Sequence, residues 1–220
     1  MIRLYCATGN PGKLGEFRLA AAHAPVEIEL LPGFSQIPPP VEDGATFEEN
    51  AVLKSLHYAR GAGGTGGTGV ALGACGAGAS ACQPAPFLLF ADDSGLEVDA
   101  LGGEPGVRSA RYCGHHGDDE ANNRLLLEKL RGAQNRTARF VCAVALVEDG
   151  RLRGVYRGAV EGAILHEPRG SGGFGYDPLF YYPPFDCSFG EAGAREKFSV
   201  SHRGQALRAM LEEIAAPRKV

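Results

Sequence analysis

Residues 87–95 read Phe-Leu-Leu-Phe-Ala-Asp-Asp-Ser-Gly, an apolar run that ends in two adjacent carboxylates. Short apolar runs of this kind predict a buried strand. Because ligands of α/β proteins bind where strands end, we expect Asp92 and Asp93 in a loop that forms part of a site. Two neighbouring negative charges need a cation, and Mg²⁺ favours one or two carboxylates together with substrate phosphates. A solvated turn closed by Ser94 and Gly95 explains the same stretch equally well.

The composition is that of a soluble globular protein, with 220 residues, 44% hydrophobic and 22% charged. The net charge of −4 argues against a nucleic-acid partner, although it allows a local basic pocket for a nucleotide. We find no basic segment followed by an apolar signal-peptide core, and no apolar run near the roughly 20 residues of a membrane span. The six cysteines include no C-x-x-C pair, which predicts free thiols rather than a zinc site. We therefore expect a cytoplasmic protein without a membrane partner.

The N-terminal segment combines a predicted strand over 2–7, a glycine-containing turn over 8–13 and a predicted helix. Free N–H groups and the dipole at a helix N-terminus favour a phosphate, and Lys13 adds a positive charge there. The segment is not a Walker A loop, because two residues rather than four separate Gly9 from Gly12. A plain turn with a solvated lysine is the alternative.

A second helix is predicted to begin after Thr46, which together with Glu49 fits the S/T-x-x-E capping box. The Glu49 carboxylate therefore either caps this helix or, together with Asn50, faces the acidic pair, and local sequence favours the cap. Residues 61–86 contain nine glycines and seven alanines. Such a segment buries too little apolar surface to offset the entropy of ordering it, so we expect a flexible surface insertion.

The second half of the chain predicts a strand over 96–101 and a β-hairpin from 139–147 and 151–160. Phe174 lies between glycines that leave its ring free to stack on a nucleobase, although a core aromatic under a turn is the commoner arrangement. Ser201 is a predicted N-cap for a C-terminal helix. The basic residues beside this cap suit anionic or carbonyl groups, with a solvated basic turn as the alternative.

Taken together, these segments resemble those of the inosine triphosphate pyrophosphatases, also called dITP/XTP pyrophosphatases. The matching segments are residues 7–13, 46–51, 91–96, 105–112, 172–178 and 201–204. Each motif alone is weak, but six motifs in the family's order over nearly the whole chain are specific. The insertion at 61–86 departs from the family, which has a short connection there.

The resemblance implies one domain over residues 1–220, an α/β fold in which an elongated mixed sheet with flanking helices forms two lobes around a central nucleotide cleft. It also implies a homodimer and Mg²⁺ as the cofactor. The implied metal site contains Glu49, Asp92 and Asp93, and the implied catalytic residues are Asp93, as general base, and Lys13. The implied substrate-binding residues are Thr8, Gly9, Asn10, Pro11, Gly12, Lys13, Ser94, Phe174, Gly175, Tyr176, Asp177, Lys197, His202 and Arg203.

The implied reaction hydrolyses ITP, dITP or XTP to the monophosphate and pyrophosphate, which removes non-standard purines from the nucleotide pool. A 6-keto purine presents O6 as an acceptor to Lys197, Arg203 or backbone amides. The amino group of adenine would leave such donors unpaired, at roughly 1–3 kcal/mol per group. Two alternatives stay open: a related nucleotide pyrophosphatase with another base preference, and a nucleotide-binding sensor without turnover. The argument against the sensor is that four of the implied residues are intact: Lys13, Glu49, Asp92 and Asp93.

Overall fold

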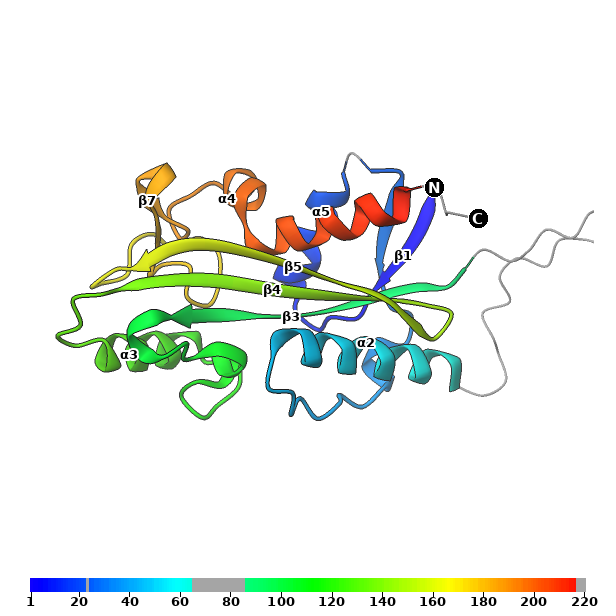
Figure 1. Ribbon diagram of the computed structural model, residues 1–220, viewed down its shortest axis with the longest axis horizontal. Coiled ribbons are helices and arrows are strands. Elements are labelled where there is room, and N and C mark those ends of the chain that lie inside the picture. Colours follow the sequence, from blue (N-terminus) through cyan, green and yellow to red (C-terminus); the bar gives the residue numbers. More distant parts are fainter. Residues whose placement is uncertain (23, 65–85, 217–220) are drawn as a thin grey trace, which may run out of the picture.

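The computed structural model describes residues 1–22, 24–64 and 86–216. Its centre is a seven-stranded mixed sheet in the order β2-β1-β3-β4-β5-β6-β7, with helices on both faces (Figure 1). The strands are β1 (Ile2–Cys6), β2 (Val26–Leu30), β3 (Leu88–Val98), β4 (Thr137–Glu148), β5 (Arg151–Ile164), β6 (Phe180–Tyr182) and β7 (Cys187–Ser188). The helices are α1 (Pro11–Ala21), α2 (Phe47–Gly64), α3 (Asp119–Lys129), α4 (Ala194–Val200) and α5 (His202–Ala215), with 3₁₀ turns η1 (Phe34–Gln36), η2 (Asp99–Leu101), η3 (Gly106–Arg111) and η4 (Pro183–Phe185).

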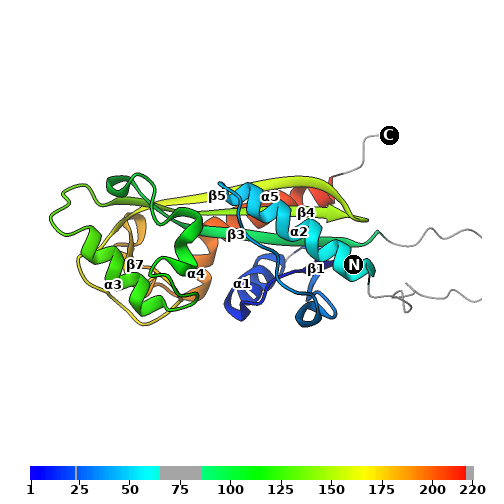
Figure 2. The same cartoon turned by 90° about the horizontal axis from the view of Figure 1, so that it is seen from below.

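The long strands β3, β4 and β5 connect two lobes, one with α3, α4 and β7 and the other with α1, α2 and β1 (Figure 2). This arrangement confirms the mixed α/β fold and the hairpin expected from sequence. The apolar run of β4 is buried on both faces: Cys142 and Val144 pack in the cluster that contains α5 residues, whereas Val141 and Ala143 pack against α2. Because successive strand residues point to opposite faces, an unbroken apolar run is what a strand covered on both sides requires.

The acidic pair lies inside a strand, which corrects the prediction of a loop or a solvated turn. In the antiparallel register between β3 and β4, Asp92 is opposite Val144 and Asp93 is opposite Ala143. The strand continues because β4 offers it an unbroken partner and because lysines neutralise both carboxylates. The segment predicted as a strand over 96–101 ends earlier, at Val98, and its last residues form η2.

The sheet opens beside the acidic pair. Strand β1 pairs with β3 only from Leu88 to Phe90, and its last bond to β3 runs from the Ala7 amide to the Phe90 carbonyl. Beyond that point β1 turns away into α1, so the β1-side edge of β3 at residues 92–95 faces the space between the lobes. The first four residues of the predicted insertion, 61–64, instead complete α2. Most of the predicted insertion lies outside the described residues.

Candidate active site

A cleft of about 570 Å³ lies at this opening, within the size range of small-molecule sites. Its walls come from the β1–α1 turn, β3, α2, η3 and the loop that carries Phe174. Of the residues predicted for the site, those on the cleft are Thr8, Gly9, Asn10, Pro11, Lys13, Asp92, Asp93, Ser94, Phe174, Gly175, Tyr176, Asp177 and Arg203. Gly12, Glu49, Lys197 and His202 do not line it.

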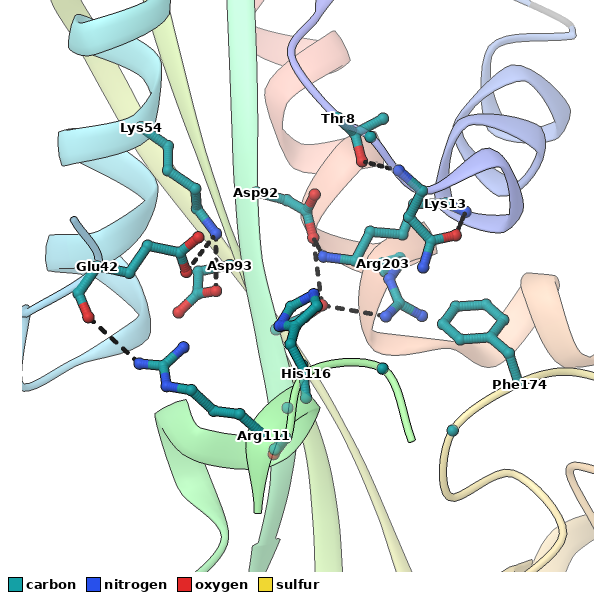
Figure 3. Close-up of a pocket in the computed structure, with 18 of the residues that line it drawn as sticks. Thr8, Lys13, Glu42, Lys54, Asp92, Asp93, Arg111, His116, Phe174 and Arg203 are labelled. Atoms are coloured by element: carbon teal, nitrogen blue, oxygen red, sulfur yellow. Dashed lines mark hydrogen bonds and ion pairs between the residues drawn. The ribbon is translucent and has the colours of Figure 1, made fainter. Parts of the chain in front are cut away.

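Asp92 and Asp93 project from opposite sides of β3, and each meets its own lysine (Figure 3). Lys13 Nζ lies 2.7 Å from Asp92 Oδ2, and Lys54 Nζ lies 2.8 Å from Asp93 Oδ1. Burial by itself would raise the pKa of Asp92, but the positive charges of Lys13, Lys54 and Arg203 outweigh it and hold this pKa below its usual value. Asp92 therefore stays ionised and anchors the surrounding cations.

The turn before α1 is held in place by its own side chains. Asn10 caps the helix, since its Oδ1 accepts hydrogen bonds from the amides of Gly12 at 2.8 Å and Lys13 at 3.2 Å. The Thr8 hydroxyl accepts a bond from the Asn10 amide at 3.2 Å. The positive end of the helix and the ammonium of Lys13 therefore face the cleft together, an arrangement that favours an anion.

Around Asp93 the structure brings Asn50, which was expected to face the acidic pair, together with Lys54 and Glu42, which sequence reasoning missed. Lys54 Nζ also lies 3.2 Å from Glu42 Oε2, so one ammonium bridges two carboxylates, and Asn50 Nδ2 donates to Asp93 Oδ2 at 3.2 Å. Burial raises the pKa of Asp93 above its usual value even though the charge of Lys54 opposes this. The spacing of Asn50 and Lys54 was the available signal, because residues four apart share one face of a helix. Glu42 lies in a proline-rich loop and carried no such signal.

Glu49 serves the helix rather than the cleft in this structure. Its Oε2 accepts the amide of Ala45 at 2.7 Å, and its own amide donates to the Thr46 hydroxyl at 3.1 Å. These bonds nearly match the predicted capping box. The difference is that the carboxylate accepts from the amide of Ala45 and not from that of Thr46, the residue that follows. In the part of the chain that the structure describes, no group of three or more His, Cys, Asp or Glu residues is placed to hold a metal. On this side of the cleft, Glu42 and Asp93 share the ammonium of Lys54.

At the other end of the cleft, Phe174 lies among cations. Its ring centroid is 5.0 Å from Lys197 Nζ and 4.9 Å from Arg203 Cζ, distances at which a cation attracts an aromatic face. Lys197 Nζ contacts Asp177 Oδ2 at 2.6 Å, and both Lys197 and Arg203 reach Glu16 at 3.1 Å. Figure 3 shows Phe174 and Arg203 on the same side of β3 as Lys13. A flat ring beside paired cations suits an aromatic base.

Two polar groups at this end have no hydrogen-bond partner among the described residues. One is Arg203 Nε, and the other is the His202 ring, with both of its nitrogens unpartnered. The His202 ring is fully buried and stacks on Phe140 at 4.9 Å. Burial first, and the nearby charge of Arg203 next, hold the pKa of His202 well below 6.5, so the ring is neutral. Behind the wall formed by Phe140, His202 supports the cleft rather than lining it.

Comparisons with known proteins find relatives that match nearly the whole chain. A family model described as the Ham1 family matches residues 4–213. A dITP/XTP pyrophosphatase from Exiguobacterium sp. is 45% identical over 97% of this chain and 97% of its own length. One from Thermus thermophilus is 45% identical over 96% of this chain and 91% of its own. The solved structure of the Staphylococcus aureus Ham1 protein superposes with a TM-score of 0.76 at 33% identity, covering 96% of this chain and 97% of that one.

Proposed function

The chain belongs to the Ham1 family, and we propose that it is a pyrophosphatase that hydrolyses non-standard purine nucleoside triphosphates such as ITP, dITP and XTP. One observation carries this proposal. A pair of strand carboxylates, each neutralised by a lysine, lines one cleft together with a helix N-terminus that suits phosphate and an aromatic pocket that suits a base. The curated relatives with this activity match nearly the whole chain.

The nucleotide would lie across the open edge of β3. Phe174 would stack on the base, while the α1 N-terminus and Lys13 would hold phosphate oxygens. Ser94 connects the acidic pair to the base pocket. Its hydroxyl donates to Asp92 at 3.2 Å and accepts from Arg203 at 3.0 Å. The same hydrogen bonds fix the position of Arg203 relative to the acidic pair. The residue that would recognise the base is therefore held in place relative to the residues that would carry out the reaction.

Glu42 and Asp93 fit a divalent cation. Both already contact the ammonium of Lys54, which shows that this point favours positive charge, and two carboxylates are what Mg²⁺ usually takes from a protein. A bound Mg²⁺ would neutralise charge on phosphate oxygens. The assignment of Glu49 and Asp92 to this metal has less support, because Glu49 caps α2 and the lysine at Asp92 meets no second carboxylate within the described ranges.

Asp93 is the proposed general base. Hydrogen bonds from Lys54 and Asn50 fix the orientation of its carboxylate, which lines the cleft where the phosphates would lie. Asp93 would take a proton from the water that attacks phosphorus, and pyrophosphate would leave. Lys13 would hold the phosphates in the ground state and transition state alike.

Selection of a 6-keto purine would depend on Arg203. Its Nε–H is buried without an acceptor among the described residues, although Glu16 and Ser94 accept from the two ends of the guanidinium. A carbonyl O6 would satisfy that donor, whereas the amino group of adenine would leave it unpaired at roughly 1–3 kcal/mol. Arg203→Ala should therefore narrow the preference for ITP over ATP.

We also propose a cytoplasmic location, on the basis of the free thiols, and a homodimer, as the family resemblance implies. In the part of the chain that the structure describes, no helix is both long and apolar enough to cross a membrane. A second copy would have a surface to cover in the shallow apolar groove between β5 and η4, where Val160, Tyr182 and Pro183 are among the lining residues. Sedimentation equilibrium would show the mass of a single chain if the homodimer is wrong.

Pyrophosphate release, measured with Mg²⁺ across ITP, XTP, dITP, GTP, ATP and dUTP, tests the activity. We expect ITP, XTP and dITP to be preferred. Preference for another base would indicate a related pyrophosphatase, and binding without release would indicate a sensor. Asp93→Asn should lower kcat by about 10²–10⁴-fold, whereas Lys13→Ala should mainly raise KM. A folded Asp93→Asn protein with normal kcat would exclude Asp93 as the base.

A further inference from the structure

Arg111 is the cleft cation without a carboxylate partner. Four lysine and arginine side chains line the cleft: Lys13, Lys54, Arg111 and Arg203. Lys13, Lys54 and Arg203 each have a carboxylate oxygen within 3.2 Å. Within residues 1–22, 24–64 and 86–216, Arg111 forms no ion pair, and its hydrogen bond runs from a terminal guanidinium nitrogen to the Glu42 carbonyl oxygen at 3.2 Å. This side chain therefore brings an uncompensated positive charge to the cleft.

The backbone that carries Arg111 is held firmly against β3. The Ser109 hydroxyl accepts the Leu96 amide at 2.9 Å and donates to the Gly106 carbonyl at 2.6 Å. This close approach of η3 to the strand requires the glycine at position 95, because a Cβ there would collide with the Ser109 hydroxyl. Tyr176, from the base-binding loop, donates to the Ser109 carbonyl at 2.9 Å. The charge of Arg111 is thus fixed relative to both the acidic strand and the base pocket.

The guanidinium lies at the end of the cleft away from the base pocket. Figure 3 shows Arg111 reaching from η3 toward Glu42, on the side of β3 where Lys54 and Asp93 meet, with Phe174 on the other side. A nucleotide with its base against Phe174 would direct its terminal phosphates toward this end. A planar guanidinium binds phosphate oxygens in pairs, and one bond to a backbone carbonyl leaves most of its donors available.

We propose that Arg111 binds the part of the triphosphate that leaves as pyrophosphate. This role rests on the proposed function and adds Arg111 to the residues predicted for the site. Arg111 would neutralise charge that grows on the leaving group as the bond to phosphorus breaks, so its contribution would be larger in the transition state than in the ground state. The hydrogen bond to the Glu42 carbonyl would orient the planar guanidinium and join η3 to the loop that carries Glu42.

Three variants separate this role from a structural one. Arg111→Gln keeps a polar side chain but carries no charge, whereas Arg111→Lys keeps the charge and loses the planar guanidinium. Arg108→Gln, on the same 3₁₀ turn but outside the cleft, is the matched control. For ITP hydrolysis we expect kcat/KM to fall roughly 10- to 100-fold in Arg111→Gln and less in Arg111→Lys, with no change in Arg108→Gln. Near-normal activity in Arg111→Gln would overturn the proposal.

Binding of the separate products gives a readout that does not depend on turnover. In calorimetry with Mg²⁺, Arg111→Gln should weaken binding of inorganic pyrophosphate by roughly tenfold or more and leave IMP binding unchanged. Weaker IMP binding with normal pyrophosphate binding would place Arg111 elsewhere and overturn the assignment. A thermal melt confirms that each variant is folded. A wild-type protein that binds pyrophosphate without hydrolysing ITP would refute the proposed function while leaving the binding role of Arg111 testable.

Discussion

Replacing Lys54 by methionine would test how the protein keeps adjacent carboxylates in the middle of a strand. The Lys54 ammonium lies 2.8 Å from Asp93 and 3.2 Å from Glu42, and the Lys54 side chain is 11% exposed. Methionine preserves most of the length and the apolar stem, so the change removes chiefly the charge. Two carboxylates would then face each other with no ammonium between them.

The size of the effect follows from burial. Removing one partner of a buried ion pair costs about 3–5 kcal/mol, because the other charge stays in a medium that solvates it poorly. The Asp93 side chain is 10% exposed in a cleft that opens to water, which favours the lower end of that range. For a domain of this size each kcal/mol corresponds to roughly 2–4 °C, so the melting temperature in metal-free buffer should fall by about 6–12 °C.

Scanning calorimetry with a chelator measures the loss of stability in Lys54→Met, and a Mg²⁺ titration then measures how much of it the metal restores. Mg²⁺ bound by Glu42 and Asp93 should restore stability to Lys54→Met, by about 2.7 kcal/mol at a hundredfold excess over Kd. The gain should exceed that of the wild type, where Lys54 already neutralises the site. Lys129→Met breaks an exposed pair with Glu104 and should melt like the wild type. If Lys54→Met also melts like the wild type without metal, the reasoning is refuted.

Three further predictions follow from packing and charge. Gly95→Ala should lower the free energy of unfolding by about 1–3 kcal/mol in urea titrations, because the added methyl collides with the Ser109 hydroxyl; unchanged stability would contradict the packing. Asp119→Ala removes the acceptor of the Gly175 amide at 2.7 Å and should raise KM for all nucleotides alike, so a change confined to one base in steady-state assays would count against it. The His202 ring is neutral in the folded protein, but in the unfolded chain it protonates near pH 6.5. Its contribution to the free energy of unfolding is therefore fully present above that pH. Below that pH the free energy of unfolding should decline by about 1.4 kcal/mol per pH unit. In urea titrations at several pH values, His202→Asn should not show this decline.

The sequence by itself determined the features that depend on near neighbours. The strand, turn and helix around residues 2–21, the hairpin of β4 and β5, and the Ser201 cap of α5 were all predicted, because hydrophobic period and capping act over a few residues. The capping role of Glu49 was visible for the same reason. The order of motifs along the chain was enough to indicate the family.

Only the tertiary structure decided how these motifs meet. The ion pairs in the cleft join Lys13 to Asp92 across 79 positions and Lys54 to Asp93 across 39, and a pair beside it joins Lys197 to Glu16 across 181. No local pattern specifies such pairs, because they depend on where β1 leaves the sheet and on the register of α2 against β3. The acidic pair looked like a turn by local composition, yet it lies in a strand because distant lysines neutralise it and β4 pairs with it.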